Sequence, residues 1–91
     1  MSEFRPKIIV KVREILAEKL GLQVDTILED SSFTNDLNMD SLDQADLVMA
    51  LEERYGVDFS TEDADRFKTV KDVVDAIEEE VKRNPDLAGN L

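Results

Sequence analysis

The stretch DLNMDSLD, residues 36–43, opens a helix, since residues 44–55 (QADLVMALEERY) continue for a full helical length without glycine, proline or a turn cluster. Asp40 fits the N-cap position, and Asp43 three residues later completes a pattern similar to a capping box. Ser41 then lies in the first turn, where backbone N–H groups have no intrahelical partner and the helix dipole is positive. The pattern therefore predicts an exposed serine hydroxyl at a position that favours an attached phosphate.

The helix predicted over residues 41–55 carries two apolar faces when it is wound at about 100° per residue. The wider face has the width expected of a surface that packs in a core, and it holds Leu47, Val48, Leu51 and Tyr55. The narrower face lies nearly opposite and is fringed by carboxylates, which is typical of a surface that docks a partner. We call its six residues the docking face: Leu42, Ala45 and Met49, with Glu52 on one edge and Asp46 and Glu53 on the other.

Residues 40–53 carry a more extended pattern, in which Asp-Ser-Leu is followed by D-x-x-D-L-V-M-A-L-E-E. This pattern resembles the modification site and second helix of acyl carrier proteins, and a weaker likeness extends from residues 20–21 to residues 69–70. The resemblance implies a 4′-phosphopantetheine arm on Ser41, with Asp40 beside it in the attachment motif. It also implies a phosphopantetheinyl transferase that installs the arm.

A carrier of this kind is, by the same resemblance, not an enzyme. It would present acyl intermediates as thioesters to acyl-processing enzymes of fatty-acid, polyketide or other specialised biosynthesis, and enzymes with basic surfaces would fit the docking face. Members of the family also shelter the acyl chain between helices. The lining expected here is Leu47, Val48 and Leu51, opposite Phe67 and Ile77.

Three positions in the attachment motif differ from patterns common in the family. Asn38 stands where many members have glycine, and asparagine tolerates the left-handed backbone region better than most residues. Met39 is larger than the small residue often found there, and we expect it to extend the docking face. Asp40 stands where peptidyl carriers often have histidine, which favours acyl over aminoacyl cargo. The pattern leaves open whether the carrier serves general fatty-acid synthesis or one dedicated pathway.

The composition bounds the chemistry. The chain has 91 residues, of which 42% are hydrophobic, which suits one small folded domain. Because it has no cysteine and no histidine, a Ser-His-Asp or Cys-His nucleophile and a zinc site of the usual Cys/His type are excluded within it.

No apolar run approaches the roughly 20 residues of a membrane span, and the first residues lack a signal-peptide pattern. We expect a cytoplasmic, soluble monomer.

The negative charge is concentrated in the middle of the chain. The net charge is −11, and residues 29–65 hold twelve acids and a single base, Arg54, whereas residues 1–28 hold four acids and five bases. This distribution disfavours binding to nucleic-acid phosphates and favours a partner with a basic surface.

The remaining elements follow from periodicity and punctuation. Helices are predicted over residues 6–20, 41–55, about 62–67, and from the cap at Thr69 to about 82–83. The connection over residues 22–39 is expected to be pinned to them by Ile27, Phe33 and Leu37. The predicted fold is all-α, a small bundle of three main helices plus a short one. We expect one domain over residues 1–83 and a flexible tail over residues 84–91.

Two other functions compete with the carrier. Asp36, Asn38 and Asp40 occupy positions 1, 3 and 5 of a calcium-binding loop, but position 6 is Ser41 instead of glycine and position 12 is Leu47 instead of glutamate, so calcium binding is disfavoured. The main alternative is an acidic protein–protein interaction module that carries no modification.

Overall fold

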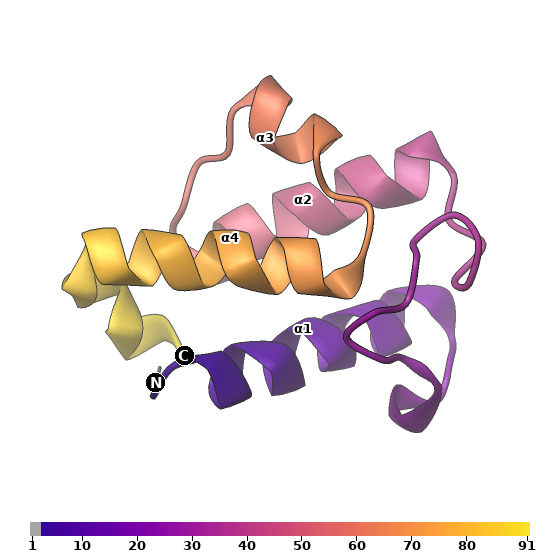
Figure 1. Cartoon of the computed structure of the whole chain (residues 1–91), viewed down its shortest axis with the longest axis horizontal. Helices are drawn as coiled ribbons and strands as arrows, with labels where there is room; N and C mark the ends of the chain where they lie inside the picture. The colour runs from indigo at the N-terminus through magenta and orange to yellow at the C-terminus, as the bar shows by residue number, and fades with distance from the viewer. Residues whose placement is uncertain (1–2) are drawn as a thin grey trace.

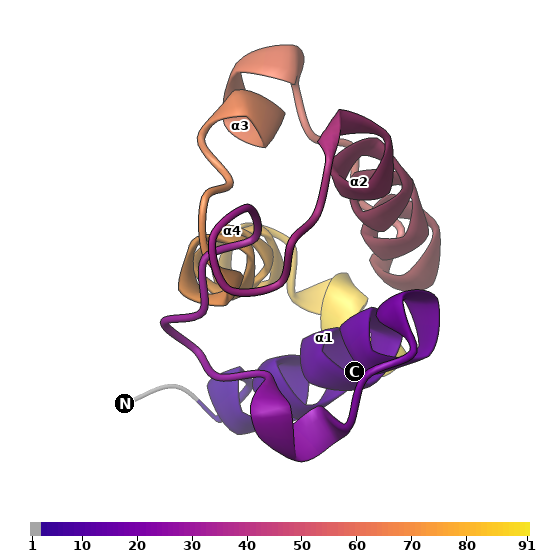
Figure 2. The same cartoon turned by 90° about the vertical axis from the view of Figure 1, so that its right-hand side faces the viewer.

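The computed structural model describes residues 3–91 and, within that range, consists of helices joined by loops. Three long helices form the body of the molecule and a short one stands beyond two of them, α3 lying outside α2 and α4 on the side away from α1 (Figures 1 and 2). The predicted all-α bundle is therefore confirmed. The bounds are α1 Arg5–Leu20, α2 Ser41–Tyr55, α3 Thr61–Asp65 and α4 Val70–Arg83, with 3₁₀ turns η1 Val24–Thr26 and η2 Pro85–Asn90.

Side-chain caps explain where three of these helices begin. Asp40, Ser60 and Thr69 each accept a hydrogen bond from the N–H three residues on, and the acid at that position accepts from the cap's own N–H. The predicted bounds of α2 agree with the structure. By contrast, α1 begins one residue before its predicted start, and α3 ends at Asp65, before its predicted end.

The core is built mainly from aliphatic side chains of α1, α2 and α4. On α2, Leu47, Leu51 and Tyr55 are at most 1% exposed, as their place on the wide apolar face predicts, while Val48 is half-buried. Together with the rest of the buried cluster they hold α2 rigidly against the other two long helices. The principal partners are Ile8, Val12 and Leu16 of α1 and Val73, Val74 and Ile77 of α4.

The connection before α2 is packed and hydrogen-bonded. Ile27, Phe33 and Leu37 are buried, as predicted. The Phe33 N–H donates to the Lys68 carbonyl (3.0 Å), and the Met39 N–H donates to the Phe33 carbonyl (2.8 Å). The Met39 side chain lies in the buried core cluster and is 5% exposed, so the expectation that Met39 extends the docking face is wrong.

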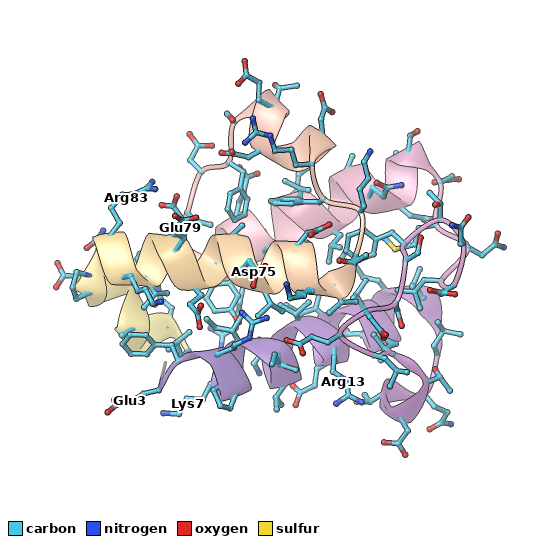
Figure 3. All side chains as sticks on the ribbon, in the orientation of Figure 1. Glu3, Lys7, Arg13, Asp75, Glu79 and Arg83 are labelled. Carbon is cyan, nitrogen blue, oxygen red and sulfur yellow. The ribbon has the colours of Figure 1, made fainter. Side chains whose placement is uncertain are left out.

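Two arginines of α1 hold the same connection. Arg13, labelled in Figure 3, donates from Nε to the Ile27 carbonyl (2.7 Å) and from Nη2 to the Val24 carbonyl (2.8 Å). Arg5 pairs with Glu29 and with Asp75 of α4, both at 2.7 Å. Arg13 thus ties the loop that leads to Ser41 to α1. Arg5 links Glu29 of the same loop to Asp75 of α4.

The C-terminal segment, over which a flexible tail is predicted for residues 84–91, has a regular conformation in the structure. Its residues form η2, which folds back against the bundle (Figure 1). Leu87 and Leu91 pack on the core, and the Asn90 side chain donates to the Tyr55 carbonyl (2.9 Å). Burial of the two leucines and satisfaction of a carbonyl at the end of α2 together favour the packed arrangement.

The Tyr55 hydroxyl gives a stability prediction. It is buried and has no hydrogen-bond partner within residues 3–91, and burial raises its pKa above the ordinary 10.0. We expect Tyr55→Phe to leave the free energy of unfolding at pH 7 unchanged or raise it by up to about 1 kcal/mol, because no partner is lost. Above pH 10 the unfolded tyrosine ionises before the folded one, so stability falls as pH rises. Denaturant titrations should show a smaller alkaline loss in the variant, and a variant clearly less stable at pH 7 would contradict this.

Candidate functional site

Ser41 is the first residue of α2, and its side chain is exposed. The capping box around it is complete, since the Asp43 N–H donates to Asp40 Oδ1 (2.8 Å) and the Asp40 N–H donates to Asp43 Oδ2 (3.2 Å). The Ser41 hydroxyl itself makes no hydrogen bond to any residue that the structure describes. It is therefore held on a rigid helix start and left available to react.

The backbone around this hydroxyl is suited to an anion. The cap uses the Asp43 N–H, and the Gln44 N–H donates to the Asp40 carbonyl. The N–H groups of Ser41 and Leu42 remain without a partner in the described range, at the positive end of the α2 dipole. A phosphodiester on Ser41 would lie beside these two donors.

Ser41 also borders a groove of about 490 Å³ between α2 and α3. Val48 of α2 and Ala64 of α3 give the groove apolar walls, and Phe59 borders it in the loop between the two helices. Of the five residues predicted to line a chain-binding surface, Val48 alone borders this groove. The other four lie in the core, are at most 5% exposed and do not border this groove, so their predicted role as an interior lining stays a prediction: Leu47, Leu51, Phe67 and Ile77.

The docking face is largely open to solvent. Leu42 and Met49 are 70% and 64% exposed, and Ala45, Asp46 and Glu53 are exposed as well. Glu52 differs, because it is half-buried and its Oε2 accepts a hydrogen bond from the Phe59 N–H (2.9 Å). This carboxylate therefore positions the loop between α2 and α3. Helical periodicity does not reveal that role, since the partner is a backbone group seven residues away.

The acids of the central segment are not neutralised by neighbours. Every ion pair within residues 3–91 lies within α1, within α4 or between them, except the pair of Arg5 with Glu29. None involves an acid between residues 30 and 65. We therefore expect salt to raise the melting temperature by roughly 5 °C between about 0.02 M and 0.5 M NaCl, because screening weakens their mutual repulsion. Thermal melts followed by circular dichroism measure this, and an unchanged midpoint would contradict it.

The structure gives no support to the calcium loop. No group of three or more His, Cys, Asp or Glu side chains that could hold a metal ion comes together within residues 3–91. Asp36 accepts a hydrogen bond from the Ser32 N–H (2.7 Å), and Asp40 caps α2. Asn38 has a φ of 55°, the left-handed conformation expected of it, and so serves the turn.

In the same described range, no helix has the length and apolar character needed to cross a membrane.

Comparisons with known proteins agree with this geometry. The family model described as "Phosphopantetheine attachment site" matches residues 10–77, a range that includes Ser41. An acyl carrier protein of Thermosynechococcus vestitus is 44% identical over 75 residues, which cover 82% of this chain and 93% of that protein. The solved structure of an acyl carrier protein from Enterococcus faecalis superposes with a TM-score of 0.71 at 31% identity, covering 82% of this chain and 95% of that one.

Proposed function

The chain belongs to the family of phosphopantetheine-bearing acyl carrier proteins, and on that basis we propose that Ser41 is the residue to which the 4′-phosphopantetheine arm is attached. The observation that carries this proposal is the exposed hydroxyl at the first position of α2, which makes no hydrogen bond within residues 3–91. The unpartnered N–H groups of Ser41 and Leu42 would bind phosphate oxygens, and the Asp40–Asp43 box would keep the serine in place.

This chain has no cysteine and so no thiol of its own. The arm supplies the thiol, which holds acyl groups as thioesters. The folded chain itself would present the loaded arm, shelter the acyl group and dock to partner enzymes. We place the first segment of the acyl chain in the groove that begins at Ser41 and runs past Val48 and Ala64. Burial of methylene groups there would stabilise the loaded protein.

The proposed docking partners are acyl-processing enzymes with basic surfaces. Leu42 and Met49 would enter apolar depressions of the partner, while Asp46 and Glu53 would meet its cations. The carrier itself would be non-catalytic, monomeric and cytoplasmic. Its domain would comprise residues 1–83, with η2 packed on it as an addition.

Intact-mass spectrometry tests the proposal. The protein is incubated with coenzyme A, Mg²⁺ and a phosphopantetheinyl transferase of broad specificity. We expect the mass of every molecule to increase by one phosphopantetheine group. A folded protein that gains no mass would instead support the unmodified acidic interaction module.

A further inference from the structure

We propose that Phe59 sets the length of acyl chain that this protein shelters, because it borders both the groove at Ser41 and a second hollow between α3 and α4. The inference concerns the arm proposed above for Ser41 and depends on it. Its basis is that Phe59 borders both hollows.

The second hollow lies between α3 and α4 and measures about 270 Å³. Seven of its ten lining residues are charged and form a polar rim, and three of them, Asp75, Glu79 and Arg83, follow one another along α4 in Figure 3. Its apolar lining consists of Phe59, Phe67 and Ala76. Among the described residues, Phe59 alone belongs to the linings of both this hollow and the groove at Ser41, so the two meet at this residue.

Contacts on two sides hold Phe59 in that position. Its ring meets the ring of Phe67 edge to face, with centroids 5.3 Å apart and planes at 88°. Phe67 is itself anchored in the core, at 5% exposure. On the other side, Glu52 of α2 accepts a hydrogen bond from the Phe59 N–H at 2.9 Å. Phe59 is thus fixed between α2 and the core below α3.

This arrangement limits the length of acyl chain that the protein can shelter. A chain that enters beside Ser41 gains contact with Val48 and Ala64 until its end meets the Phe59 ring. Further methylene groups find no apolar space while the ring is in place, so they remain in water and add nothing to stability. Removal of the ring would join the two hollows and let a longer chain reach Ala76.

The test measures the melting temperature as a function of chain length. The transferase is supplied with saturated acyl-coenzyme A donors of increasing length, and mass spectrometry confirms each loaded product. In the wild type we expect the melting temperature to rise with chain length and then level off. In Phe59→Ala the melting temperature should level off at chains longer by about four to six carbons, because six ring carbons are removed. Phe59→Leu, which disturbs the fold less, should give a smaller shift in the same direction.

Ala76→Leu is the matched control, because it fills only the second hollow. Alone it should leave the wild-type profile unchanged, and combined with Phe59→Ala it should restore levelling at the wild-type length. Loaded Phe59 variants that level off at the wild-type length would overturn the inference, as would a double variant that keeps the longer limit. Loss of loading in every variant and the wild type would instead overturn the assignment of Ser41.

Discussion

Replacement of Ser41 by alanine is expected to abolish the transfer of phosphopantetheine while leaving the fold intact. The variant removes the hydroxyl oxygen that would bond to phosphorus, and no neighbouring group replaces it. Since the side chain is exposed and unbonded within residues 3–91, the free energy of unfolding should change by less than about 0.5 kcal/mol. The measurement is the intact mass after incubation with coenzyme A and transferase.

Thr61 provides a matched control for that experiment. It is the first residue of α3, it is exposed, and it follows a capping box of the same kind. Thr61→Ala should be modified as completely as the wild type, because a hydroxyl at a helix start is not sufficient without the surrounding attachment motif. A full mass gain in Ser41→Ala, or its loss in Thr61→Ala, would contradict the assignment.

Reversal of charge on the docking face is expected to have the second large effect. Asp46 and Glu53 are exposed and make no hydrogen bond or ion pair in the part of the chain that the structure describes. Replacing both with lysine should lower kcat/KM for an acyl-processing partner with a basic surface roughly 10- to 100-fold at low salt. The deficit should shrink as salt increases, since screening removes the electrostatic contribution.

Glu52 is left out of this variant because its carboxylate holds the Phe59 N–H. Lysine at that position would alter the α2–α3 loop as well as the surface charge. The control is the double change Asp58→Lys and Glu62→Lys, which alters the net charge equally at exposed positions outside α2. Equal kcat/KM values for the two double variants would show that the docking face has no special role.

Local signals were sufficient to predict most of the fold. The start of α2 depends on a cap and an acid three residues apart, and its end on Gly56, which adopts a φ of 70°. The wide apolar face likewise follows from periodicity. Because these features are encoded within a few neighbouring residues, the sequence alone predicts the bounds of α2 and the exposed position of Ser41.

The errors arose where contacts link residues distant in the chain. Met39 packs in the core cluster with residues from other helices, and the Asn90 side chain donates to the Tyr55 carbonyl, 35 residues away. The groove beside Ser41 borders Phe59, which is not among the residues predicted to line a chain-binding surface, because α3 stands beyond α2 and α4 (Figure 2). Such placements depend on how the helices meet in space, which neither periodicity nor capping specifies.

The most direct measurement is fragmentation mass spectrometry of the modified wild-type protein, which assigns the added group to a single residue. We predict that the phosphopantetheine group is found on Ser41 in every modified molecule. Its presence on Ser31, Ser32 or Ser60, or a folded protein that never acquires it, would contradict the account.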